Sequence, residues 1–146
     1  MHDYKNYPEL TNQQIEEFGW ESPHKQITED FDADVVKVHD GDTITLKTNF
    51  RDFNFPLRFL DIDAPELNEG GQEAREWLKG QILGEIVQIK INKANRVDKF
   101  GRLLGKVLSR GLDMGEAQVS LGYALPFGKK KEGQIPTLSM VFKKWY

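Results

Sequence analysis

Cysteine is absent from the 146-residue chain. Its absence excludes disulfide bonds, thiolate metal sites and a cysteine nucleophile together. Histidine is scarce, and two of the three histidines (His2, His24 and His39) lie near the N-terminus. A zinc site built on several histidines would therefore lack ligands in the rest of the chain. If this protein binds a metal, we expect oxygen atoms to hold it.

Long hydrophobic runs are also absent. No apolar stretch approaches the roughly 20 residues that a membrane-spanning helix requires, so we expect no membrane partner. The N-terminus, from Met1 to Leu10, lacks the basic-then-apolar order of a signal peptide. The sequence as written predicts a cytoplasmic protein, although a secreted mature form stays open. With 38% hydrophobic and 29% charged residues, the composition indicates one globular domain, which we expect to be a monomer.

Charge is unevenly divided along the chain. Residues 1–34 contain nine acidic and two basic residues, a formal charge of −7, whereas residues 35–146 contain fourteen acidic and eighteen basic residues, a formal charge of +4. A basic body weakly favours a nucleic-acid partner. We interpret residues 1–32 as an acidic extension that packs Trp20 on the body, and residues 33–146 as the functional domain. An inhibitory contact between the extension and the site is an open alternative.

Hydrophobic periodicity predicts five strands and about three helices. Thr11 and Gln14 form a capping-box pattern for a helix that ends near Gly19. Period-two alternation predicts a hairpin around Asp40-Gly41-Asp42, a third strand over Phe55–Ile62, and two later strands over Ile86–Ile91 and Leu103–Leu108. Helical patterns cover Gln72–Leu83, the segment from Asp113 to Leu121, and a terminal segment after Pro136. This order is compatible with a mainly β, α+β protein built on a five-stranded Greek-key barrel of the OB-fold type.

Three short motifs contain residue types that could carry chemistry. Asp40 to Thr43 reads either as a plain hairpin turn or as a source of metal ligands. An EF-hand loop is excluded, because Ile44, Thr45 and Arg51 stand where that loop needs an oxygen ligand, a glycine and a glutamate.

The second motif, Arg58 to Glu66, places one arginine and two aspartates in an otherwise apolar strand. Arg58 could simply pair with an acid, or Asp42 and Asp63 could jointly hold a divalent cation that Glu66 faces. The third motif, Arg96 to Arg102, reads as a solvated turn or as a phosphate clamp, because a guanidinium can grip two phosphate oxygens.

Together the three motifs resemble the staphylococcal nuclease family. That family has Asp-Gly-Asp-Thr, then an arginine followed by Asp-x-Pro-Glu, then Asp-Lys-Tyr-Gly-Arg, and the same order occurs here between Ala33 and Ala124. The resemblance implies an OB-fold, a DNA or RNA substrate, a Ca²⁺ cofactor and products that carry a 3′-phosphate. Two alternatives remain, a non-catalytic nuclease-like module that binds nucleic acid or protein, and a structural calcium-binding domain.

The resemblance also implies roles for individual residues. It places Ca²⁺ on Asp42, Asp63 and the backbone carbonyl of Ala64, with Asp40 near the ion, and it makes Arg58, Glu66 and Arg102 catalytic. Lys99, Phe100 and Tyr123 are the expected substrate-binding residues. Phe100 replaces the tyrosine of the family motif, and the register of Tyr123 and Phe127 against the family's stacking tyrosines is unsafe because of Pro126 and Gly128. Asp61 stands where the family archetype has an apolar residue.

Overall fold

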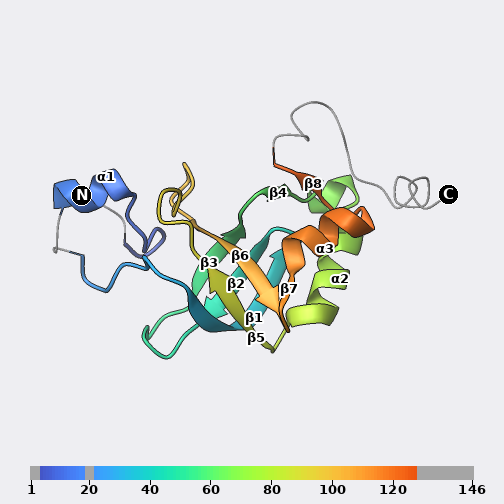
Figure 1. The fold of residues 1–146 in the computed structure, drawn as a ribbon, viewed down its shortest axis with the longest axis horizontal. Helices are drawn as coiled ribbons and strands as arrows, with labels where there is room; N and C mark the ends of the chain where they lie inside the picture. Colours follow the sequence, from blue (N-terminus) through green and yellow to red (C-terminus); the bar gives the residue numbers. More distant parts are fainter. Residues whose placement is uncertain (1–3, 19–21, 128–146) are drawn as a thin grey trace.

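The body of the protein is a closed β-barrel (Figure 1). The computed structural model describes residues 4–18 and 22–127. The strands pair in the order β3-β2-β1-β5-β6-β7, and a parallel pairing of β3 with β6 closes the barrel. The strands are β1 Phe31–Asp40, β2 Thr43–Lys47, β3 Phe55–Phe59, β4 Ile62–Asp63, β5 Ile86–Lys90, β6 Leu103–Ser109, β7 Leu112–Asp113 and β8 Leu125–Pro126. This arrangement confirms the predicted mainly β, OB-fold type of α+β architecture.

Alternating side chains fill the barrel. In β2, Ile44 and Leu46 are buried while the residues between them are not, and β5 buries Val87 and Ile89 in the same way. The period of two predicted from the sequence is therefore the period of burial. The remaining strands add further apolar residues to the same core, among them Val35, Val38, Phe55, Leu57, Phe59, Leu103 and Val107.

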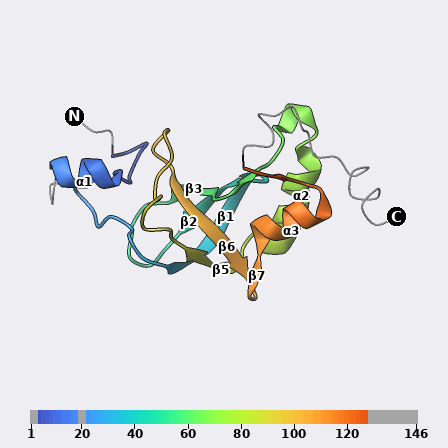
Figure 2. The ribbon, with the colours of Figure 1, turned by 45° about the horizontal axis from the view of Figure 1, so that its top comes forward.

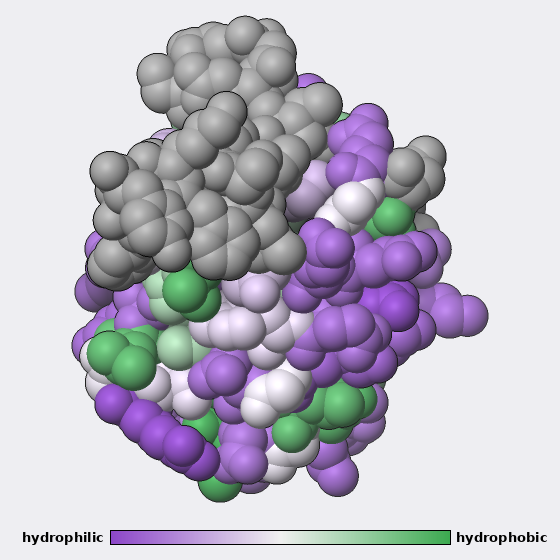
Figure 3. Space-filling model, turned by 90° about the vertical axis from the view of Figure 1, so that its right-hand side faces the viewer, coloured by the Kyte–Doolittle hydropathy of each residue, from purple (hydrophilic) through white to green (hydrophobic). Residues whose placement is uncertain are grey.

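Helices lie at both ends of the barrel. Helix α2 (Gln72–Ile82) and helix α3 (Met114–Leu121) lie at one end, and α1 (Asn12–Phe18) lies at the opposite end in both Figures 1 and 2. Helix α2 turns Ala74, Leu78 and Ile82 inward. The face at this end is mainly hydrophilic, with apolar side chains in small separate groups (Figure 3). No helix in the described part of the chain is long and apolar enough to cross a membrane.

Local capping signals place the helices as predicted. The backbone N–H of Thr11 donates to Gln14 Oε1 at 3.0 Å, and the N–H of Gln14 donates to Thr11 Oγ1 at 3.1 Å, which is a capping box. Asp113 Oδ1 accepts from the N–H groups of Gly115 and Glu116 at the start of α3. Helix α2 ends one residue before the expected Leu83, whose backbone is extended. Trp20 and the helix expected after Pro136 lie outside the described residues.

The third strand is shorter than the sequence predicts. It ends at Phe59 instead of continuing to Ile62, and β4 then pairs with β8. The chain reverses at Asp61, whose φ of 71° lies in the left-handed region. Aspartate tolerates this region better than most residues do. Asp61 lies in a turn of the backbone and not within a strand, so this position does not require an apolar residue.

Candidate active site

Two carboxylates meet at the guanidinium of Arg58. Its Nη2 lies 2.6 Å from Asp63 Oδ1 and 3.3 Å from Asp42 Oδ2. The three side chains are 11–15% exposed, so water screens these charges only partly. The structure thus brings together three of the residues expected at the site. The ion pair expected as the simpler role of Arg58 is also present, and it involves both acids.

Strand pairing places Asp42 beside Arg58. In the β2–β3 ladder Thr43 is opposite Arg58, and the N–H of Phe59 donates to the carbonyl of Asp42 at 2.8 Å. Arg58 Nη1 also donates to the carbonyls of Phe59 and Ile62, at 2.6 and 2.9 Å. These bonds span the reversal at Asp61 and bring the chain back toward Arg58. Asp63 directly follows Ile62, whose carbonyl is bonded to Arg58, and therefore reaches the same guanidinium.

Backbone groups orient Asp42. The N–H of Ala64 donates to Asp42 Oδ2 at 2.9 Å, while Thr43 Oγ1 donates to Asp42 Oδ1 at 3.1 Å. Asp40 Oδ1 accepts from the N–H of Asp42 at 3.0 Å. Ala64 is buried and lies directly against the Asp42 carboxylate. Both carboxylate oxygens of Asp42 therefore have donors within the protein.

A side chain of α3 fixes the turn at Gly41. Gln118 is fully buried, and its Nε2 donates to the carbonyl of Gly41 at 2.7 Å. A Cβ at position 41 would lie 2.6 Å from Gln118 Oε1 and 2.8 Å from the Cβ of Ala64, so only glycine fits without a shift. Sequence reasoning did not single out Gln118. Its spacing of four residues from the buried Met114 was the available signal, because it places both on one face of α3.

Negative charge accumulates beside Asp40. Burial, the hydrogen bond and charge of Asp42 and the charge of Glu66 together raise the pKa of Asp40 to about 7, although the hydrogen bond from the backbone N–H of Asp42 lowers it. The effect of Glu66 shows that this exposed carboxylate lies near the same acids. Glu66 precedes a 3-10 turn (Leu67–Glu69), and its carbonyl accepts from the N–H groups of Glu69 and Gly71 at 2.8 and 2.9 Å.

The donor set suits a hard divalent cation. Carboxylate and carbonyl oxygens are the ligands that Ca²⁺ prefers, and a cation would relieve the repulsion that Asp42 and Glu66 add to the effect of burial on Asp40. Over residues 4–18 and 22–127 no three His, Cys, Asp or Glu side chains form a metal-binding group. A cation there would take its further oxygen ligands from the backbone, such as the Ala64 carbonyl, and from water.

Arg102 lies on a loop next to the strand of Arg58. In the parallel β3–β6 ladder Arg58 is opposite Leu104, so Arg102 stands just before the neighbouring strand. Its Nε donates to Asp98 Oδ2 at 2.8 Å, and Asp98 Oδ1 accepts from the N–H groups of Phe100 and Arg102, both at 2.9 Å. The contacts described for Arg102 are thus with its own loop, and its grip on phosphate stays a prediction.

Aromatic side chains border the arginines. Phe100 is 59% exposed, and the cationic groups of Lys99 and Arg102 lie 5.1 and 5.4 Å from its ring centre. Tyr123, expected to bind substrate, stacks on Trp77 of α2 with 5.8 Å between ring centres. Phe127 was not assigned a role, yet its exposed ring lies 5.9 Å from the Arg58 guanidinium. Phe127 follows α3, where the family's stacking tyrosines are expected, and this position could have indicated a role for it at the site.

Comparisons with known proteins agree with this geometry. The sequence profile of the family described as staphylococcal nuclease homologue matches residues 56–143, which include Arg58, Asp63, Glu66 and Arg102. A micrococcal nuclease of Shigella flexneri is 38% identical over 79 residues, which cover 53% of this chain and 42% of that protein. An uncharacterized protein of Bacillus anthracis is 31% identical over 98 residues, covering 62% of this chain and 45% of that protein. The chain therefore spans less than half the length of each of these relatives.

Proposed function

We propose, from the premise that this chain belongs to the family of staphylococcal nuclease homologues, that it hydrolyses phosphodiester bonds of DNA or RNA with a bound calcium ion. The observation that carries the proposal is the convergence of Asp42 and Asp63 on Arg58 Nη2. Two carboxylates that would serve as oxygen ligands thus lie beside a guanidinium that would bind phosphate. A phosphodiester resists water because its own charge repels nucleophiles and its leaving group is poor, so these groups address its main barriers.

Asp42, Asp63 and the Ala64 carbonyl would hold the ion. When bound, it would supply Lewis-acid chemistry that lowers the negative charge an attacking water meets at the phosphate. Arg58 Nη2 now neutralises both carboxylates. With a cation on these carboxylates, that nitrogen would donate to a phosphate oxygen.

Glu66 and Arg102 complete the proposed chemistry. The exposed carboxylate of Glu66 orients a water molecule and takes its proton. Arg102 uses Nε to bond Asp98, which leaves its terminal nitrogens to bind phosphate as charge builds in the transition state. Arg102 also favours departure of the 5′ oxygen, so that the product carries a 3′-phosphate.

A nuclease assay with Glu66→Gln tests the proposal. We expect Ca²⁺-dependent cleavage of single-stranded DNA, duplex DNA or RNA that EGTA abolishes, and a loss of at least about a hundredfold in kcat for Glu66→Gln, because an amide cannot take a proton. Glu73→Gln, an exposed glutamate in the first turn of α2, is the matched control and should retain activity. End-labelled substrate identifies the position of the product phosphate.

Each result of this assay has a definite meaning. Binding of nucleic acid without Ca²⁺-dependent cleavage by the unmodified chain would contradict the proposal and favour a non-catalytic module. Calcium stabilisation with no effect of nucleotide on calcium affinity would favour a structural calcium domain. Near-normal turnover by Glu66→Gln would remove Glu66 from the role of general base.

A further inference from the structure

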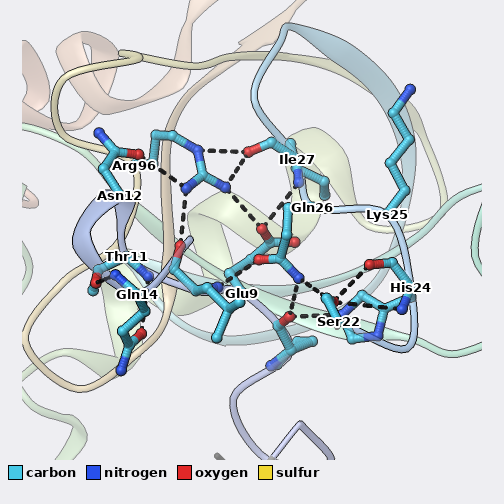
Figure 4. A network of polar contacts seen from close by, with 12 residues as sticks. Glu9, Thr11, Asn12, Gln14, Ser22, His24, Lys25, Gln26, Ile27 and Arg96 are labelled. Carbon is cyan, nitrogen blue, oxygen red and sulfur yellow. Dashed lines mark hydrogen bonds and ion pairs between the residues drawn. The ribbon is translucent and has the colours of Figure 1, made fainter. Parts of the chain in front are cut away.

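A buried charge cluster fastens residues 4–18 and 22–30, here called the arm, to the barrel (Figure 4). Glu9 is 1% exposed. Its Oε2 accepts from Arg96 Nη2 and from the N–H of Ile27, both at 3.0 Å, and its Oε1 accepts from Arg51 Nη2. Burial of a charge is costly unless it is paired, and here both carboxylate oxygens meet an arginine. The arm is therefore docked at a defined position and is not a loose acidic extension.

Arg96 joins the arm to the base of the Arg102 loop. Its Nη1 donates to the carbonyl of Leu10 at 2.9 Å and its Nε to that of Ile27 at 2.7 Å. The sequence placed Arg96 in a segment that reads as a solvated turn or as a phosphate clamp, but its guanidinium is buried against the arm. The carbonyl of Arg96 accepts from the N–H of Leu104 at 2.8 Å, and the bridge between Val97 and Leu103 follows it. The arm thus holds Arg96, and the segment of Arg96 pairs with residues 103–104 at the base of the loop.

The arm also contacts the tip of this loop. Tyr7 packs against Gly101, so closely that a Cβ at position 101 would lie 2.7 Å from Tyr7 Cδ1. Gly101 has a φ of 84°, which most residues avoid. It stands between Phe100 and Arg102, and its N–H donates to the carbonyl of Asp98 at 3.0 Å. The loop is therefore contacted at its base by buried charges and at its tip by an aromatic ring.

We propose that the arm positions Arg102 for catalysis, with Tyr7 and Glu9 acting as positioning residues through the loop of residues 96–104. This inference rests on the proposed nuclease function. Exposed loops open locally at low free-energy cost unless other parts of the structure restrain them. A two-pronged phosphate contact tolerates little displacement, since a shift of about 1 Å at a reacting group can cost about a hundredfold in rate. The ring of Tyr7 supplies that restraint beside the catalytic arginine.

A double-mutant cycle separates positioning from general stability. We expect Tyr7→Ala to lower kcat about tenfold when Arg102 is present, and by less than about twofold in the Arg102→Ala background, because the arm then has no catalytic group to place. Tyr7→Phe keeps the ring on Gly101 and should restore kcat. Leu112→Ala truncates an exposed apolar side chain after the far end of β6 and should leave kcat unchanged.

Amide hydrogen exchange of residues 100–102 provides a readout without substrate. Tyr7→Ala should speed exchange at these amides about tenfold while the melting temperature changes little. Equal fractional losses of kcat in both backgrounds, no loss, or a gain of activity in Tyr7→Ala would overturn the inference while the nuclease function stands. An unmodified chain that cleaves no nucleic acid would instead contradict the proposed function. In that case unchanged exchange at residues 100–102 would show that the arm does not hold the loop either.

Discussion

Replacing Glu9 with glutamine should destabilise the whole protein. Glu9 carries the only carboxylate described within the buried cluster of residues 9, 51 and 96, and it faces two guanidinium groups. In Glu9→Gln both Arg51 and Arg96 would stay buried with no negative partner at that position. Burial already lowers the pKa of Arg96, an effect that the charge of Glu9 opposes. The substitution therefore exposes the full desolvation cost of two cations.

The expected loss follows from this geometry. Removing one partner of a buried ion pair costs about 3–5 kcal/mol, because the other charge stays buried. Glutamine is isosteric and its oxygen still accepts a hydrogen bond, which places the expected loss near the lower limit, at about 3 kcal/mol. For a domain of this size that loss lowers the Tm by about 6–12 °C. With an m-value of about 2 kcal/mol/M, the urea midpoint falls by about 1.5 M.

Urea unfolding and hydrogen exchange measure this loss together. The amide of Leu10, which donates to Gln26 Oε1 at 2.5 Å, reports whether the arm detaches before the barrel unfolds. Glu29→Gln changes an exposed glutamate of the same arm and should stay within about 0.5 kcal/mol of the unmodified chain. A loss below about 1 kcal/mol for Glu9→Gln, with unchanged exchange at Leu10, would refute the conclusion that this cluster fastens the arm.

Three further predictions concern the site. Burial and the charge of Asp42 raise the pKa of Asp40 from 3.8 to about 7, so between these pH values the folded state holds a proton that the unfolded chain releases. In the presence of a chelator, the free energy of unfolding should therefore fall as the pH rises from about 4 to about 7. A plot of Tm against pH should be flatter for Asp40→Asn than for the unmodified chain, and equal slopes would contradict the raised pKa. Gly41→Ala should cost about 1–3 kcal/mol in urea unfolding, since its Cβ would overlap Gln118 and Ala64, and an unchanged midpoint would show that the turn adapts freely. Arg102→Lys should lower kcat/KM at least about tenfold, since an ammonium cannot reproduce the two-pronged contact, whereas a rate like that of the unmodified chain would indicate simple charge attraction.

Local signals were enough to predict most of the barrel and its helices. Alternation in β2 and β5, and the capping residues Thr11 and Asp113, depend on neighbours within a few positions, so the sequence alone reports them. The end of β3 could not be predicted in this way. The apolar run continues to Ile62, but the backbone reverses at Asp61, where Arg58 bonds the carbonyls on both sides of the turn. That reversal depends on a side chain whose position only the tertiary structure defines.

The candidate site, like the barrel, was predictable where it depends on local sequence and strand pairing. The proximity of Asp42, Arg58 and Asp63 follows from the motif order, because a hairpin followed by a third strand brings Asp42 beside Arg58 and Asp63 comes soon after that strand. The roles expected for these residues stay predictions. The hydrogen bond from Gln118 to the carbonyl of Gly41 was not predictable, since Gln118 is distant in sequence and a buried glutamine has no distinctive sequence pattern. The roles expected for Lys99, Phe100 and Tyr123 stay predictions, and the stacking of Tyr123 on Trp77 covers one face of its ring.

The docked arm also changes the electrostatic argument for a nucleic-acid substrate. The formal charge of +4 for residues 35–146 includes Arg51 and Arg96, yet both are buried and face Glu9 of the arm. Neither can contact a phosphate, so the net charge of the body overstates its attraction for a polyanion. The attraction must come from local groups instead, and Arg58, Lys99 and Arg102 lie beside exposed aromatic rings that can stack on bases. The case for nucleic acid therefore rests on these two groups of cationic and aromatic side chains and not on the charge of the chain.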